Sequence, residues 1–187
     1  WMAATWLAGR LARQDIQITV VESPDIRTVG VGEATVPAIR DYFRDIGVTE
    51  AEVMAATQGT VKLGIEFRDW KRDGESFFHP FGLYGMPSRG VPFHQFWLKR
   101  QAEGDAMPLA AYSLCTQLAM ANQMMEPPVS PPNDLGVFNW AVHFDAGLYA
   151  QFLRRKATSE LGVTHIDGTV VEVAKNGENG FLTGVTL

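Results

Sequence analysis

The sequence predicts an α/β fold, and three features predict it. Residues 2–11 repeat apolar side chains at helical spacing, and the β-branched run 16–22 that follows is typical of a strand. Residues 61–67 alternate apolar and polar side chains, as a half-buried strand does. Near the other end, a helix pattern over 145–161 leads into three strand patterns, at 163–166, 168–173 and 181–187. Helices that alternate with strands in this way indicate layered α/β architecture.

The first helix and strand resemble the second half of a βαβ unit. Ala3, Leu7 and Leu11 recur four residues apart, as do Met2 and Trp6, and predict one apolar face of the helix. The strand ends at Glu22, and in dinucleotide-binding folds an acid at this place binds a ribose hydroxyl. The competing interpretation of Glu22 is an exposed acid at a strand end.

Capping and turn residues predict further helices and a hairpin. Thr35 is expected to cap a helix over 39–46, and residues 49–52 carry a capping box for another short helix. A helix is also expected over 109–125. Residues 176–180, rich in Asn and Gly, predict a hairpin connection between the last two strands.

Composition and charge exclude several classes of protein. A net charge of −5, without any basic run, argues against nucleic-acid binding. No apolar stretch is long enough to span a membrane. The single cysteine fits a reducing compartment, so a cytoplasmic location is expected. Cys115 is the only cysteine, which excludes an internal disulfide and a cysteine metal cluster. The histidines show no metal-ligand spacing, and three are interpreted as structural or surface residues: His94, His143 and His165.

Five stretches, in this order, resemble the flavin-dependent tryptophan halogenases over nearly the whole chain. Residues 1–4 resemble the helix start that follows the family's GxGxxG motif, and 29–37 resemble its flavin strap, GVGEAT-P. Residues 61–65 resemble the strand that carries an essential lysine, and 78–82 resemble an aromatic substrate-site motif. Residues 144–146 resemble the segment that returns to the FAD domain.

The resemblance implies a Rossmann-like FAD-binding fold of the aromatic-hydroxylase type, with inserted helices that bind substrate. Within a single partial domain, 1–187, residues 1–70 and 140–187 would form the FAD-binding part and 71–139 the substrate-side insertion. The GxGxxG, the WxWxIP motif and a second catalytic glutamate do not occur here. We therefore interpret the chain as truncated at both ends, and expect this stretch alone to be inactive.

The resemblance also implies a reaction. A separate reductase supplies FADH2, which with O2 and chloride or bromide yields a hypohalous acid, and a lysine directs that acid onto tryptophan or a related indole. Lys62 is the expected catalytic lysine, because an ammonium can polarise a hypohalous acid. The competing interpretation is that Lys62, which alternates with Val61 and Leu63, faces solvent.

The resemblance assigns binding roles as well. Glu22 would bind the ribose of the FAD adenosine, Val171 would place backbone groups against the adenine, and His79 and Phe81 would sandwich the indole. The flavin strap would comprise Gly30, Gly32, Glu33, Ala34 and Thr35. The residues alone leave simpler interpretations open: sheet core at Val171, packing in an aromatic loop at His79 and Phe81, and a helix-capping turn for the strap. No metal is expected.

Two other functions remain open at this point. An FAD-dependent monooxygenase that hydroxylates an aromatic would share the fold, but it would need neither Lys62 nor a WxWxIP segment. A non-catalytic, truncated binding domain derived from the same fold is the second alternative. The full-length gene would distinguish it, since a protein that truly ended at Leu187 would favour a binding role.

Overall fold

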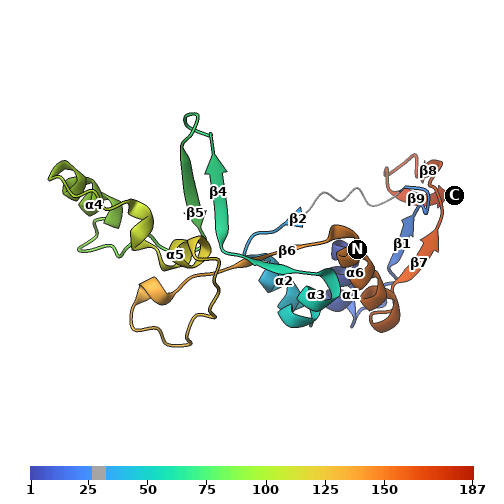
Figure 1. Ribbon diagram of the computed structural model, residues 1–187. Helices are drawn as coiled ribbons and strands as arrows, with labels where there is room; N and C mark the ends of the chain where they lie inside the picture. The colour runs from blue at the N-terminus through green and yellow to red at the C-terminus, as the bar shows by residue number, and fades with distance from the viewer. Residues whose placement is uncertain (27–32) are drawn as a thin grey trace. The chain divides into compact units, whose positions relative to one another are not determined.

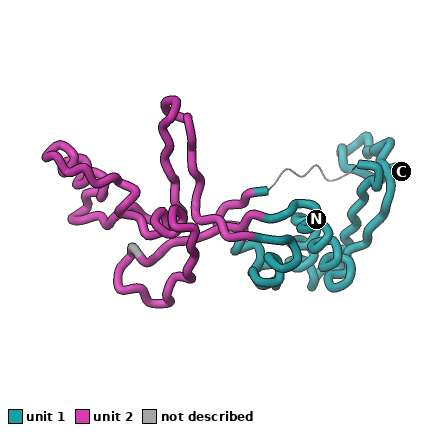
Figure 2. Tube along the Cα trace, viewed as in Figure 1, with its two compact units in different colours: residues 1–33, 40–59, 144–187 teal, residues 34–39, 60–143 magenta. Residues whose placement is uncertain are grey.

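The structure is a computed structural model that describes residues 1–26 and 33–187, without the side chain of Leu135. The chain packs into two compact units (Figure 2). Unit 1 comprises residues 1–33, 40–59 and 144–187, and unit 2 comprises residues 34–39 and 60–143. The two units are defined by how the chain packs. The division into an FAD-binding part and a substrate-side insertion, with boundaries at residues 70 and 140, concerns function and stays a prediction.

Unit 1 is built around a parallel pair of strands and two helices (Figure 1). Strands β1 (Thr19–Glu22) and β7 (Thr164–Asp167) pair in parallel, so their carboxyl ends lie at the same edge. The helix–strand order of α1 (Met2–Leu11) and β1 agrees with the expected half of a βαβ unit. Helix α6 (Ala146–Glu160) packs against α1 and leads into β7. The parallel pair confirms the α/β prediction for this unit.

The buried face of α1 differs from the expected one. Ala4, Thr5 and Ala8 are buried, whereas Leu7 is 40% exposed and Trp6 is exposed as well. Small side chains let two helices approach closely, and Ala4 and Ala8 pack in one cluster with two further buried residues, Ala157 and Val163. The face that the four-residue periodicity indicates is therefore not the buried one, because close helix packing selects alanine.

Two short helices, α2 (Ile39–Asp45) and α3 (Glu50–Thr57), contribute to the core of unit 1. The capping box is confirmed: the Thr49 side chain accepts from the Glu52 N–H at 3.2 Å, and the Glu52 carboxylate accepts from the Thr49 N–H at 2.7 Å. Large side chains from these helices and α6 are almost fully buried: Phe43, Val53, Tyr149 and Leu153.

The chain ends in an antiparallel hairpin of β8 (Glu172–Lys175) and β9 (Leu182–Thr186). The hairpin connection predicted at 176–180 is confirmed. The strand expected from residue 168 begins only at Glu172, because the Gly168 N–H donates to the Glu22 carbonyl, at 3.0 Å, rather than to β9.

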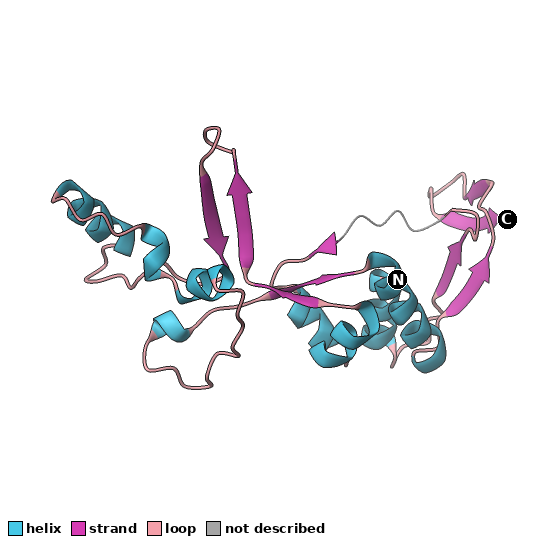
Figure 3. Cartoon of the chain, viewed as in Figure 1, coloured by secondary structure: helices cyan, strands magenta, loops and turns pink. Residues whose placement is uncertain are grey.

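Most of a three-stranded sheet of order β2-β6-β3 belongs to unit 2. Figure 3 draws the strands of the chain in magenta. The strands of this sheet are β2 (Glu33–Ala34), β6 (Ala141–Phe144) and β3 (Thr60–Lys62). Thr35 does not cap the next helix as expected. Its hydroxyl donates to the Val142 carbonyl at 2.7 Å and accepts from the Val142 N–H at 3.0 Å, so it extends the sheet instead.

The single strand expected over 61–67 is divided at Leu63. Beyond this residue, β4 (Gly64–Arg68) pairs with β5 (Ser76–Pro80) in an antiparallel hairpin. The Leu63 carbonyl accepts from the Phe81 N–H at 2.8 Å and from the Cys115 thiol at 3.0 Å. Alternation in the sequence does not show such a break, because both strands keep the same period.

Gly64 begins the hairpin at a point where only glycine fits. A Cβ at this position would lie 2.4 Å from the His79 carbonyl oxygen. The glycine therefore permits the close approach of β5, which carries His79, to the end of the strand segment that carries Lys62.

The helical segments of unit 2 are short: α4 (Phe93–Ala102), the 3₁₀ turn η1 (Leu109–Tyr112), α5 (Leu114–Met120) and the turn η2 (Asp134–Gly136). The helix expected over 109–125 is thus interrupted at Ser113. This residue ends η1, and its hydroxyl caps α5 by accepting from the Thr116 N–H at 3.3 Å. Among the residues that the structure describes, no helix is long and apolar enough to cross a bilayer.

Candidate active site

Lys62 is a buried lysine at the end of an edge strand of the three-stranded sheet. It ends β3, where it pairs with Ala141 of β6, and only 8% of it is exposed. Its Nζ donates to the Thr35 carbonyl at 2.9 Å and lies 5.5 Å from the centre of the Phe81 ring. The interpretation of Lys62 as a solvent-facing residue is therefore wrong.

The Lys62 ammonium has no carboxylate partner among residues 1–26 and 33–187. Burial lowers the pKa of this amine, because removal from water disfavours the charged form. An ammonium has three N–H donors, and the Thr35 carbonyl takes one of them. The remaining donors are available to a bound molecule, and the lowered pKa makes the neutral amine more accessible than on an exposed lysine.

Thr35 connects two predicted features of the sequence, the flavin strap and the lysine strand. Its hydroxyl and its N–H both bond to Val142 of β6, which fixes the Thr35 backbone beside β6, the strand that separates β2 from β3. The carbonyl of the same residue then holds the Lys62 ammonium. The last strap residue thus orients the expected catalytic side chain, a contact that sequence spacing does not reveal.

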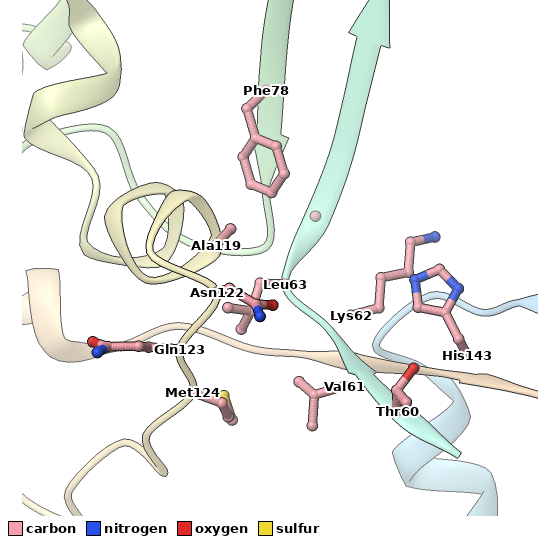
Figure 4. Close-up of a pocket in the computed structure, with 11 residues that line it drawn as sticks. Thr60, Val61, Lys62, Leu63, Phe78, Ala119, Asn122, Gln123, Met124 and His143 are labelled. Carbon is pink, nitrogen blue, oxygen red and sulfur yellow. The ribbon is translucent and has the colours of Figure 1, made fainter. Parts of the chain in front are cut away.

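A cavity of about 340 Å³ lies beside Lys62 (Figure 4). Thr60, Phe78 and His143 contribute to its walls together with residues 119–124 at and beyond the end of α5. Its size falls in the range of small-molecule sites, which are usually several hundred Å³. A cavity that combines one buried cation with aromatic and amide groups suits a small, polarisable or anionic guest.

His143 is a site residue that the sequence interpretation missed. It lies opposite Thr60 in the β3–β6 ladder and shares the cavity wall with Lys62. Although part of the residue stays exposed, desolvation lowers the pKa of its imidazole, and the charge of Lys62 lowers it further. The ring is therefore neutral at neutral pH. Only the register between β3 and β6 could have indicated that His143 lies near Lys62.

The two expected indole-stacking residues are differently placed. Phe81 is half-buried, and its ring faces the Lys62 ammonium. His79 is exposed on β5 opposite Ile65, and it is not among the residues that form the cavity wall. The structure therefore brings Phe81, but not His79, to the lysine.

The expected cofactor residues lie partly outside the described chain. Gly30 and Gly32 fall among residues 27–32, which the structure does not describe, whereas Glu33 and Ala34 form β2. Val171 is 71% exposed in this chain, so it does not belong to the core that the described residues form.

Glu22 lies at the end of a strand, as the sequence predicts. It ends β1 at the carboxyl edge of the β1–β7 pair, the edge at which α/β folds bind their ligands. Its carboxylate is 40% exposed and can therefore reach a ligand. The Trp1 indole N–H donates to one of its oxygens at 3.0 Å. The simpler interpretation of an isolated, exposed acid at a strand end does not account for this contact.

Flavin-dependent halogenases are among the solved structures that this chain resembles. BrvH, a flavin-dependent halogenase from Brevundimonas sp. BAL3, is 46% identical with a TM-score of 0.91, over 100% of this chain and 36% of that chain. Xcc4156, a flavin-dependent halogenase from Xanthomonas campestris, is 40% identical with a TM-score of 0.89 and the same coverage. The expected FAD-binding fold of this enzyme class is therefore confirmed.

The tryptophan halogenase family model matches residues 1–187, and the chain belongs to that family. Among curated relatives, the tryptophan 7-halogenase RebH from Lentzea aerocolonigenes is 33% identical over 99% of this chain. The chain spans 37% of the length of RebH and similar shares of the other relatives.

Proposed function

We propose that the protein containing this chain is an FAD-dependent halogenase that acts on tryptophan or a related indole. It would take FADH2 from a separate reductase and use O2 and chloride or bromide as co-substrates. Family membership supports the class of reaction, and the buried Lys62 beside a cavity supports the step that directs the halogen.

The observation that carries this proposal is the ammonium of Lys62. Its residue is buried and lines a cavity, and no carboxylate among the described residues neutralises it. Isolated buried charges are costly to a protein, so they are found where they bind a ligand or perform chemistry. A hypohalous acid accepts a hydrogen bond from such a donor, which withdraws electrons from the halogen and makes it more electrophilic.

When bound, the reduced flavin supplies the redox chemistry that converts O2 and halide into hypohalous acid. The chain's own residues would bind the cofactor and orient it. Glu22 would accept ribose hydroxyls, and residues 30–35 would pass along the flavin ring. Val171 would use its carbonyl, since its N–H already donates to the Thr186 carbonyl at 2.9 Å.

Phe81 links the lysine to the substrate. Its ring lies near enough to the Lys62 ammonium for a cation–π interaction, which holds the side chain beside an aromatic surface. An indole stacked on the Phe81 ring would therefore lie next to the bound hypohalous acid. His79, two residues earlier, would close the other side of the indole once substrate is bound.

The experiment uses the full-length protein with a flavin reductase, NADH, FAD and halide, and mass spectrometry of tryptophan and a panel of indoles. A product with the halogen isotope pattern, absent in Lys62→Ala, is expected. Lys99→Ala is the matched control, because Lys99 is an exposed lysine of the same unit paired with Glu103. Hydroxylation without halogen would favour the monooxygenase, and halogenation that survives Lys62→Ala would refute the role of the lysine. No product at all would favour the non-catalytic binding domain.

A further inference from the structure

Three side chains from distant parts of unit 1 contact the carboxylate of Glu22, and a fourth contacts His165; with Glu22 we call them the Glu22 cluster: Trp1, Arg154, His165 and Asp167. They come from the start of α1, from α6 and from β7, which lies beside β1 (Figure 1). Glu22 pairs directly with Asp167 across the two parallel strands. The cluster therefore lies at the carboxyl edge of the sheet.

Both oxygens of the Glu22 carboxylate have a fixed neighbour. The Trp1 indole N–H donates to Oε2 at 3.0 Å. The Arg154 guanidinium lies 3.6 Å from Oε1. Two contacts on opposite oxygens restrict the rotation of the carboxylate, so it is held in one orientation before any ligand binds.

His165 adds a buried and incompletely bonded group. Only 9% of its side chain is exposed, and its ring packs against the Trp1 indole with centroids 5.3 Å apart. Its Nε2 lies 3.1 Å from Glu22 Oε1 and 3.5 Å from Asp167 Oδ1, yet it makes no hydrogen bond of ordinary geometry. Buried polar atoms are nearly always bonded, so this exception calls for a reason.

Stability does not account for the cluster. Glu22 is partly exposed and Arg154 is exposed as well, and ion pairs of this kind add little to folding. A preorganised carboxylate, in contrast, binds hydroxyl groups more tightly, because less freedom is lost on binding. We propose that Arg154 and His165 are positioning residues that hold Glu22 for the ribose hydroxyls of the FAD adenosine, an inference that rests on the proposed function.

The test compares FAD with FMN, which lacks the adenosine. In the full-length protein, His165→Gln and Arg154→Gln should each weaken FAD binding about three- to tenfold, as expected for a hydrogen bond made less favourable. The same variants should leave the dissociation constant of FMN unchanged. A merely structural role would weaken both flavins equally, so the ratio of the two constants is the measurement.

Arg155→Gln is the matched control, because Arg155 is the exposed neighbour of Arg154 on α6 and undergoes the same loss of charge. It should leave the FAD constant unchanged. Equal weakening of FAD and FMN, or no change in the FAD constant of either variant, would overturn the positioning role while leaving the proposed function intact. A full-length protein that binds neither flavin would overturn both.

Discussion

Glu22 in unit 1 and Lys62 in unit 2 are both charged groups assigned to function, but their surroundings are opposite. The Trp1 indole N–H donates to the Glu22 carboxylate, and the Arg154 guanidinium and the His165 ring lie within 3.6 Å of it. The Lys62 ammonium has a single backbone carbonyl and an aromatic face. A group that binds a stable ligand gains from being held still, whereas a group that meets a reactive species must keep its donors free.

The largest effect is expected from Lys62→Met, which keeps much of the side-chain volume and removes the charge. Halogenation should fall roughly 10²–10³-fold, as when one preorganised donor to a reacting group is lost. The thermal midpoint should not fall, because the buried charge has no carboxylate partner in the described chain. Product assays and thermal melts measure both. A marked loss of stability would mean that Lys62 serves the fold.

Glu22→Gln should give the opposite pattern. The dissociation constant of FAD should rise roughly ten- to a hundredfold, because hydrogen bonds to a charged acceptor are worth about 1.5–3 kcal/mol. Halogenation at saturating FAD should stay unchanged, and so should folding stability, since the carboxylate is partly exposed. Flavin fluorescence titration and a product assay at high FAD test this. A reduced rate at saturation would contradict a purely binding role.

Thr35→Val extends the comparison, because it changes the residue whose carbonyl binds the Lys62 ammonium and leaves the Glu22 site unchanged. The Val142 N–H would lose its acceptor, at a cost of about 1–3 kcal/mol in stability. Halogenation should fall as well, because the Thr35 carbonyl that holds Lys62 is displaced. Urea unfolding gives the stability, and Thr35→Ser, which keeps the hydroxyl, is the control. Equal losses in the two variants would show that the hydroxyl is not the important group.

The smallest effect concerns His143. In Lys62→Met its pKa should rise toward the ordinary value of 6.5, because a nearby positive charge is removed. A lowered folded-state pKa means that, below about pH 6.5, the unfolded chain takes up the proton first, so acid weakens the fold. The variant should therefore lose less stability on acidification. Proton NMR of the imidazole, with exposed His94 as reference, measures the shift, and an unchanged His143 would contradict the coupling.

The sequence predicted elements whose signals are local, and missed contacts between distant segments. The capping box at Thr49 and the hairpin at 176–180 were predicted because each depends on neighbouring residues. Thr35 was expected to cap a helix, but Val142, more than a hundred residues away, bonds to its hydroxyl. A pattern of neighbouring residues does not show that a distant backbone group competes for the same hydroxyl.

In the candidate site, too, local motifs were predictable from the sequence and contacts between distant segments were not. Motif resemblance identified Glu22 and Lys62, yet the positions of His143 and His165 depend on which strands pair. Both histidines were interpreted as structural or surface residues, because a lone histidine in a strand pattern has no distinguishing feature. Strand pairing places one against the Glu22 carboxylate and the other beside Lys62.

The most direct test of the account is to ask whether Lys62 directs hypohalous acid or helps to form it. The full-length protein and its Lys62→Met variant would turn over with reduced FAD, halide and tryptophan, and monochlorodimedone in solution would trap any hypohalous acid that escapes. The account predicts that the variant loses halogenated tryptophan and gains trapped acid, with their sum unchanged. A sum that falls together with the product would contradict it, because Lys62 would then be needed where the oxidant is made.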